Sequence, residues 1–308
     1  MALTGAAGFI GRAVAVRLRA AGHTVIGCDR APGSDVSAVD LRDGEAVAAW
    51  VREARPDAAV HAGAISGPMA VGGDLRRLFD VNVAGTVNLL AALAAEGVPR
   101  LVHLSSNAVY APGPAGVALG EDAPRHAAEP YGASKIAAEA AIAAWAHAGG
   151  PAAFVLRLSS VYGAGRRTPY LFSTIARAFA EARPARVTRE GENLRQFLHV
   201  EDAARAVEAA LGAVAHGFEA VNVAGAEHVS EARIGALCAR HLPGLRLEEI
   251  PHAGPTADTA GPLDCSRAAR RLGWRPEIAL AEGTAALFRG RGAAPAPAPG
   301  TPAKPHRP

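Results

Sequence analysis

The stretch Leu3-Thr4-Gly5-Ala6-Ala7-Gly8-Phe9-Ile10-Gly11 decides the fold. Its glycines have the spacing GxxGxxG, where a short apolar run changes into a helical pattern. Such a turn lets the backbone approach a pyrophosphate closely, and the following helix points its positive N-terminus at that group. A glycine turn that only packs a strand against a helix is the alternative. Three residues precede Thr4, which predicts a short first strand or a true start further upstream.

An acidic residue follows at the distance typical of a dinucleotide site. Asp29 ends the next apolar run, 18 residues beyond Gly11, where a carboxylate can accept hydrogen bonds from the adenosine ribose. This favours NAD, because the carboxylate would repel the 2′-phosphate of NADP. The adjacent Arg30 could accommodate that phosphate, so NADP stays open. An ordinary turn residue at the end of a strand is the other interpretation of Asp29.

Short apolar runs alternate with amphipathic stretches through the first half of the chain. The runs cover 25–29, 58–61, 101–105 and 154–158, and the helical stretches cover 11–21, 44–55, 74–96 and 131–148. Strands without polar alternation, separated by helices, predict an α/β fold with a doubly wound parallel sheet of the Rossmann type, covered on both faces.

The second half predicts a smaller C-terminal α/β lobe. Helical patterns at 170–183 and 200–215 accompany extended runs at 186–189 and 245–250. Ser230 is placed to cap a helix that runs to His241, and 221–223 resembles another strand of the large sheet. We expect the following division: a dinucleotide-binding domain over 1–163 with 196–225 returning to it, a substrate lobe over 164–195 and 226–291, and a disordered tail over 292–308.

Composition and charge argue against several classes of protein. Half of the 308 residues are hydrophobic and 20% are charged, which describes a soluble chain with a core. The net charge of +3 sits on no long basic run, so we expect no nucleic-acid partner. No targeting segment and no uncharged apolar stretch of about 18 residues is visible, which predicts no membrane partner and a cytoplasmic location. Three cysteines without a CxxC pair argue against disulfides and a metal site.

Tyr131-Gly132-Ala133-Ser134-Lys135 is a YxxxK motif at the start of a predicted helix. Residues four apart lie on one helical face, so Lys135 could stabilise a Tyr131 phenolate. A phenol whose reference pKa is about 10 could then serve as a base nearer neutral pH. Ser106 follows a strand at the edge where doubly wound folds bind ligands, and it could hold a substrate oxygen. Alone, a YxxxK motif more often marks a surface helix with a tyrosine.

Taken in order, these motifs resemble those of the extended short-chain dehydrogenase/reductases of the NAD-dependent epimerase/dehydratase family. The resemblance covers nearly all of residues 1–290. It also rests on these stretches: Asp40-Leu41, His61-Ala62-Gly63-Ala64, 81–86, 104–110, 157–163, 195–202, 264–267 and 272–276.

The resemblance implies roles for individual residues. The catalytic residues would be Ser106, Tyr131 and Lys135. The cofactor would be bound by Gly5, Gly8, Phe9, Ile10, Gly11, Asp29, Arg30, Asp40, Leu41, Ala62, Ala64, Asn82, Tyr131 and Lys135. The substrate would contact Ser66, Ser106, Asn107, Tyr131, Ser160, Arg167 and Arg195.

For some of these residues the resemblance also implies which part of the ligand or of the site they contact. Asp40 and Leu41 would contact the adenine, and Asn82 would support the active-site lysine. In relatives that use nucleotide sugars, the residue matching Arg195 contacts the diphosphate; a salt bridge from Arg195 to Glu192 or Glu201 is the alternative. A homodimer is expected from the same analogy.

Departures from the family pattern narrow the reaction. Sugar 4,6-dehydratases carry an Asp-Glu pair after the catalytic Ser or Thr, where Asn107 and Ala108 stand here. An amide and a methyl group cannot act as the acid and base that eliminate water. Epimerases that invert carbons next to a ketone use a Cys or a further Lys near that site, and no cysteine lies between Cys28 and Cys238.

Another departure concerns the phosphate-binding groups. Many relatives have an Arg-Pro-Gly-Asp segment before the final helix, whereas residues 252–258 lack the arginine. Losing one of two phosphate-binding guanidinium groups weakens a diphosphate site. Either Arg166 and Arg167 compensate, or the substrate is smaller and carries a carboxylate; a solvated basic turn is the alternative for this pair.

We therefore expect an NAD-dependent oxidoreductase or epimerase that acts on a secondary alcohol of a sugar or nucleotide sugar by Tyr131-assisted hydride transfer. A net NAD(P)-dependent dehydrogenase or reductase of a smaller sugar, sugar acid or polyol is the alternative within this chemistry. A non-catalytic dinucleotide-binding sensor is the alternative of another class, although such proteins usually lack the tyrosine or the lysine.

Overall fold

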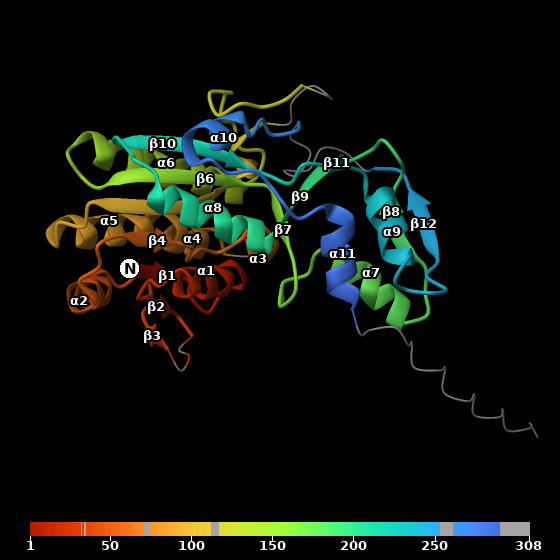
Figure 1. Cartoon of the computed structure of the whole chain (residues 1–308), viewed down its shortest axis with the longest axis horizontal. Helices are drawn as coiled ribbons and strands as arrows, with labels where there is room; N and C mark the ends of the chain where they lie inside the picture. Colours follow the sequence, from red (N-terminus) through yellow and green to blue (C-terminus); the bar gives the residue numbers. More distant parts are fainter. Residues whose placement is uncertain (32, 34, 71–73, 112–116, 253–260, 290–308) are drawn as a thin grey trace, which may run out of the picture.

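A computed structural model describes residues 1–31, 33, 35–70, 74–111, 117–252 and 261–289. Within these residues, seven parallel strands form the central sheet in the order β3-β2-β1-β4-β5-β6-β10 (Figure 1). The strands are β1 (Ala2–Thr4), β2 (Ile26–Asp29), β3 (Val36–Ala38), β4 (Ala59–His61), β5 (Arg100–Ser106), β6 (Ala152–Leu158) and β10 (Phe218–Val223). The doubly wound parallel sheet is confirmed. The tail expected over 292–308 lies outside the described residues.

The strand order reverses between β1 and β4, and ligands of doubly wound folds bind at such a point. Although β1 has three residues, Thr4 at its end pairs with Cys28 of β2 and with His61 of β4. The turns that follow β1, β2 and β4 therefore lie side by side at the carboxyl edge of the sheet.

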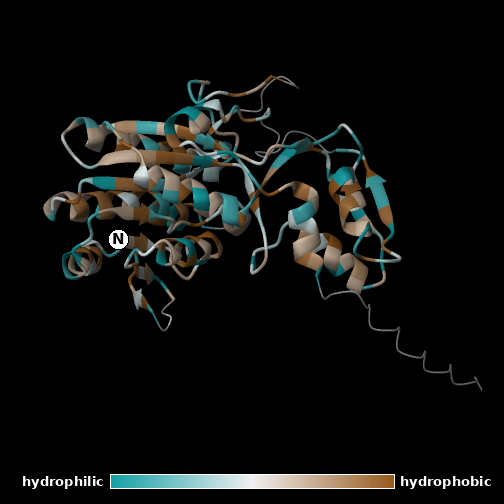
Figure 2. Ribbon diagram, in the orientation of Figure 1, coloured by the Kyte–Doolittle hydropathy of each residue, from teal (hydrophilic) through white to brown (hydrophobic). Residues whose placement is uncertain are grey.

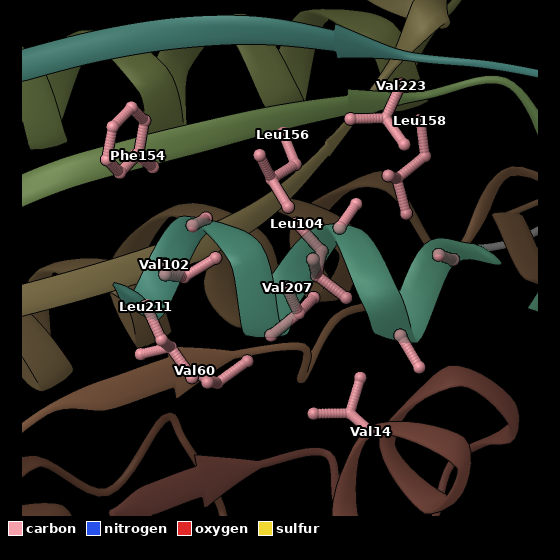
Figure 3. Packing of buried hydrophobic residues seen from close by; sticks show 14 of the residues in the cluster. Val14, Val60, Val102, Leu104, Phe154, Leu156, Leu158, Val207, Leu211 and Val223 are labelled. Atoms are coloured by element: carbon pink, nitrogen blue, oxygen red, sulfur yellow. The ribbon is translucent and has the colours of Figure 1, made fainter. Parts of the chain in front are cut away.

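Helices cover both faces of the sheet. On one face lie α1 (Phe9–Ala20) and α8 (Val200–Gly212), and on the other α2 (Gly44–Ala54), α5 (Gly85–Ala95) and α6 (Pro130–His147). Figure 3 shows Val14 of α1 and Val207 of α8 among the branched side chains of the strands, and these residues are fully buried. Each such side chain contributes about 1.5–3 kcal/mol to folding.

The helix expected over 74–96 is one continuous run that changes its winding. It comprises α4 (Leu75–Phe79), a π-helical turn (Asp80–Ala84) and α5. By length and composition alone, Leu75–Ala95 could cross a membrane. Leu89, Leu90 and Leu93 pack in the core beside α2 and α6, so the packing on the sheet accounts for the apolar character of the α5 part. Figure 2 likewise shows hydrophobic residues along the central strands.

The C-terminal lobe contains two smaller sheets (Figure 1). One joins β7 (Ser160–Tyr162), β9 (Arg195–His199) and β11 (His228–Val229), and the other pairs β8 (Ala185–Thr188) with β12 (Leu247–Ile250). A third core lies between them and the helices α7 (Leu171–Ala180), α9 (Glu231–Ala239) and α11 (Leu280–Phe288), whereas α10 (Ser266–Leu272) packs on the large sheet.

Two expectations for this half are confirmed. Residues 221–223 lie in β10 of the large sheet, and the Ser230 Oγ accepts a hydrogen bond from the Arg233 N–H, 3.2 Å away, at the start of α9. Of the returning segment expected over 196–225, α8 and β10 pack with the large sheet, while β9 pairs with β7 and β11.

Two short elements of the first half, α3 (Gly67–Ala70) and the 3-10 turn η2 (Asn107–Val109), complete the described fold.

Candidate active site

The glycine turn is packed so tightly that side chains would not fit. Gly5 has a φ of +68°, and a Cβ there would lie 2.6 Å from the Gly63 nitrogen. A Cβ on Gly11 would lie 2.0 Å from the Gly5 oxygen. The helix α1 begins at Phe9, and among the described residues no side chain caps its N-terminus. Its first amide groups are therefore left for an anion in front of the turn.

Two adjoining cavities follow the carboxyl edge of the sheet. The smaller holds about 240 Å³ and contains the side chains of Asp29, Arg30 and Asp40 in its wall. The larger holds about 450 Å³ and contains Ser106 and Tyr131 in its wall. They share these lining residues: Gly5, Gly8, Ala62, Ala64 and Met69. The two cavities therefore form one groove that crosses the glycine turn.

Acidic residues shape the smaller end of the groove. The Asp29 carboxylate accepts hydrogen bonds from the Ala7 N–H at 3.2 Å and from the Ala31 N–H at 3.3 Å, so it ties β2 to the glycine turn. Asp40 pairs with Arg42 at 2.6 Å, and that hydrogen bond lowers the pKa of Asp40 to about 2. Both Asp29 and Asp40 reach the groove, as the sequence predicts for the adenosine end.

Asn82 lies deeper than expected. It is buried on the π-helical turn and does not line the groove in the described part of the chain. Its side chain accepts from the Ile65 N–H at 2.8 Å and donates to the Ile65 oxygen and the Ser134 Oγ, each at 3.0 Å. The hydrogen bonds that place it thus go to the neighbour of Lys135 and to the turn after β4, rather than to Lys135 itself.

The structure brings Ser106 and Tyr131 into one cavity, with Lys135 behind them. Ser106 ends β5, and its Oγ accepts a hydrogen bond from the Ala108 N–H at 3.2 Å. Tyr131 lies in the first turn of α6, and its ring packs on Gly67, where a Cβ would lie 3.3 Å from the ring carbon Cδ1. The Lys135 Nζ donates to the Leu104 oxygen at 2.8 Å, and burial lowers the pKa of Lys135 to about 8.

The residues expected at the substrate fall into two groups. Ser66, Asn107 and Ser160 line the larger cavity together with Ser106 and Tyr131. Arg167 is exposed and does not reach the wall of that cavity, which is lined instead by Arg166. Arg195 also lies outside this wall.

The wall of the larger cavity contains Thr168, which was not selected from the sequence, and Arg166, which was considered only as one of a pair with Arg167. The Arg166 guanidinium donates to the Val161 oxygen and to the Thr168 Oγ1, the latter at 3.1 Å, and its carbon Cζ lies 4.5 Å from the centre of the Tyr170 ring. The double arginine was the signal in the sequence. Spacing alone could not say which of two neighbours turns inward.

Arg195 has a different partner from the two that the sequence suggested. Its guanidinium lies 3.5 Å from Glu231, at the start of α9, rather than from Glu192 or Glu201, which were the alternative to a diphosphate contact. Glu192 accepts a hydrogen bond from the His252 N–H instead. Glu231 also accepts from the Thr188 N–H and from the Asn193 side chain, which places Arg195 in a polar cluster of the C-terminal lobe.

Comparison with known proteins identifies the family. The profile of the NAD dependent epimerase/dehydratase family matches residues 1–224. The chain belongs to this family. It is 32% identical to the dTDP-6-deoxy-L-talose 4-dehydrogenase (NAD(P)(+)) of Kitasatospora kifunensis, and the match covers 96% of each chain. It is 30% identical to a UDP-glucose 4-epimerase of Mycolicibacterium smegmatis, over 92% of this chain and 95% of the relative.

A solved family member supports the fold and the cofactor. The Thermus thermophilus UDP-glucose 4-epimerase was solved in complex with NAD, and its structure has a TM-score of 0.83 against this chain. The two sequences are 28% identical, and the match covers 94% of this chain and 98% of the relative. The groove fits such a dinucleotide, because it crosses the glycine turn at the uncapped start of α1 and Asp29 lines the smaller cavity. This chain is therefore an NAD-dependent enzyme, as its motifs predict.

Proposed function

We propose that this enzyme is a 4-epimerase of a hexose carried on a nucleoside diphosphate. The observation that carries the proposal is the meeting of Ser106 and Tyr131 in a cavity that continues into the dinucleotide groove. The names of the two relatives given above support the position of attack, because both specify carbon 4 of a nucleotide-linked sugar.

Each residue of the proposed triad has a defined task. The Tyr131 oxygen accepts the proton of the sugar hydroxyl, and the Ser106 hydroxyl, fixed by the Ala108 amide, holds the sugar oxygen. The Lys135 ammonium favours the phenolate by its charge, and a pKa of about 8 leaves most of it protonated at neutral pH. When bound, NAD supplies the acceptor of the hydride from the same carbon.

The walls of the larger cavity suit epimerisation. Inversion requires the ketone to present both of its faces, so the sugar must turn within the site. Small side chains leave room for this: Ala64, Ser66, Gly67, Ala108 and Ser160 line the cavity of about 450 Å³. Asn107 and Ala108 stand where a dehydratase would need an acid and a base, so loss of water is disfavoured.

Net oxidation is the second candidate function. The relative from Kitasatospora kifunensis is a 4-dehydrogenase by name and is 32% identical over nearly the whole chain. Both reactions begin with the same proton and hydride transfers, and they differ in whether the ketone leaves before the hydride returns.

Purified enzyme incubated with NAD and UDP-glucose, UDP-glucuronate or a dTDP-hexose tests the proposal. We expect the 4-inverted sugar, observed by NMR of the product, without net formation of NADH. Stoichiometric NADH with a 4-keto product would instead assign the dehydrogenase. Free sugars, sugar acids and polyols serve as comparison substrates, and turnover of these alone would contradict the nucleotide-sugar proposal.

Arg166 is expected to bind an anionic group of the substrate, because it places a guanidinium in the wall of the larger cavity. Replacing it by methionine should raise KM by about tenfold or more, since a hydrogen bond to a charged group contributes about 1.5–3 kcal/mol. Arg167→Met is the matched control, because Arg167 is exposed, and its KM should stay unchanged. Equal KM values in both variants would contradict a substrate contact by Arg166.

A further inference from the structure

A buried carboxylate lies one helical turn beyond the proposed catalytic lysine. Glu139 on α6 has no exposed surface. The Arg157 guanidinium donates to both of its oxygens, at 3.1 and 2.8 Å, and the Ser105 hydroxyl donates to it at 2.5 Å. Arg125 adds a fourth hydrogen bond at 3.2 Å. Neither the groove nor the proposed proton transfer uses this group directly.

Glu139 and Lys135 fasten α6 to the strand that carries Ser106. The Lys135 Nζ donates to the oxygen of Leu104, and Glu139 accepts from the side chain of the next residue, Ser105. Ser106 then turns into the larger cavity. Two side chains four residues apart on the helix thus bind two successive residues of β5.

The neighbouring strand completes this attachment. Arg157 of β6 stands opposite Ser105 in the strand register and pairs with Glu139 from that side. The Arg157 Nη1 also donates to the Tyr110 hydroxyl at 2.8 Å. The carboxylate therefore joins α6 to both β5 and β6.

Glu139 also supplies negative charge to a buried cation. Lys135 is 3% exposed, and burial lowers its pKa, whereas the Glu139 carboxylate raises it. Besides the proposed partner Tyr131, two buried rings interact electrostatically with Lys135, namely His61 on β4 and His103 on β5. Burial, and to a smaller extent Lys135, lowers the pKa of both rings, so they stay neutral and offer no counter-charge. The fixed cation of Arg157 also contacts this carboxylate, at 2.8 Å.

We propose that Glu139 is a positioning residue of this active site: it is the counter-ion that keeps Lys135 protonated, and it fixes the helix of Tyr131 against the strand of Ser106. Its catalytic consequence rests on the proposed use of Tyr131 as the proton carrier. Its electrostatic part concerns Lys135 alone and can be measured without turnover.

The composition of the chain makes that measurement direct. Of its 32 basic residues other than histidine, two are lysines, Lys135 and Lys304. Enzyme labelled with ¹³C and ¹⁵N in lysine should therefore give two side-chain signals. Lys304→Arg assigns them, and an NMR titration follows the protonation of Lys135 in the full chain.

In Glu139→Gln, we expect the titration midpoint of Lys135 to fall below its value in the unmodified enzyme, which we expect at about 8. Removing the carboxylate alone leaves the Arg157 cation buried without its partner, which destabilises the fold. The double variant Glu139→Gln with Arg157→Gln removes both charges and keeps hydrogen-bonding groups. It should fold and still show the lowered midpoint.

Tyr110→Phe is the matched control for a purely structural effect. It removes the hydroxyl that binds Arg157 and Asn222 while it leaves Glu139 in place. The Lys135 midpoint should stay unchanged in this variant. An unchanged midpoint in both Glu139 variants would overturn the proposal.

Activity supplies the second readout. With a less protonated lysine, the phenol requires a higher pH to ionise, so the rising limb of the kcat profile should move to higher pH. In the double variant kcat at neutral pH should fall about tenfold while KM is unchanged, because proton transfer alone is impaired. A loss of kcat without a shifted limb would overturn the catalytic part. If no nucleotide sugar reacts while the lysine midpoint moves as expected, the proposed function fails and the counter-ion role stands.

Discussion

Tyr131→Phe is expected to reduce kcat by about 10³-fold, within the range of general acid–base catalysis, while NAD still binds. The variant keeps the ring that packs on Gly67 and removes only the hydroxyl of this residue in the wall of the larger cavity. Without a phenol, no group of the proposed triad can take the proton as the hydride leaves. Steady-state turnover and calorimetric titration with NAD measure the two effects separately.

The control for this variant is Tyr110→Phe, which removes the hydroxyl of a different, buried tyrosine. Tyr110 is 1% exposed and lies outside the described wall of the larger cavity. We expect it to lower the melting temperature and to retain most of the turnover. A Tyr131→Phe enzyme with undiminished kcat would disprove the proton-carrier role, and unmodified enzyme that binds NAD but converts no sugar would favour the sensor.

The sequence predicts the large sheet well because its signals are local. Apolar runs separated by helical periods predict parallel strands, and the glycine turn predicts where the first strand meets its helix. Even the return of 221–223 to this sheet is visible as a short strand-like run, Val221-Asn222-Val223. The π-helical turn at Asp80–Ala84 was not predicted, because it changes the hydrogen bonding of the helix while the apolar pattern continues.

Long-range pairing explains what the sequence did not predict in the site. Arg195 contacts Glu231 on a later helix, whereas spacing suggested acids near it in the chain. Arg166 and Arg167 are identical in type, and which of them turns inward depends on contacts with Val161 and Thr168. Neither the Arg195–Glu231 pair nor the inward position of Arg166 can be predicted from the periodic pattern of apolar residues in the sequence.

Long-range contacts also explain why the burial of Glu139 was not predicted from the sequence. In the sequence it is one glutamate among alanines on a helix, which favours a solvated position. In the fold it is fully buried, because Arg157 and Ser105 arrive from two strands. Helical spacing places it one turn beyond Lys135, but its burial follows only from the sheet topology.

Gly11→Ala is expected to reduce the affinity for NAD by about 100-fold and to lower stability by about 1–3 kcal/mol, as overpacking does. The added methyl would lie 2.0 Å from the Gly5 oxygen. Gly5 cannot move away easily, because its own position is set against the Gly63 nitrogen and its φ is positive. The turn must therefore open, and this displaces the first amide groups of α1 that face the pyrophosphate.

Gly212→Ala separates this steric effect from the general effect of replacing a glycine in a helix. Gly212 ends α8, and a Cβ there would meet no atom within 4 Å. Alanine has the higher helix propensity, so this variant should be unchanged or more stable by up to about 1 kcal/mol, with its NAD affinity intact. Thermal unfolding with and without NAD compares the two variants under identical conditions. Since the methyl added at Gly11 would meet backbone atoms of Gly5 and Ala6, which cannot rotate away as a side chain does, an unaltered dissociation constant for NAD in Gly11→Ala would mean that NAD binding does not depend on this turn.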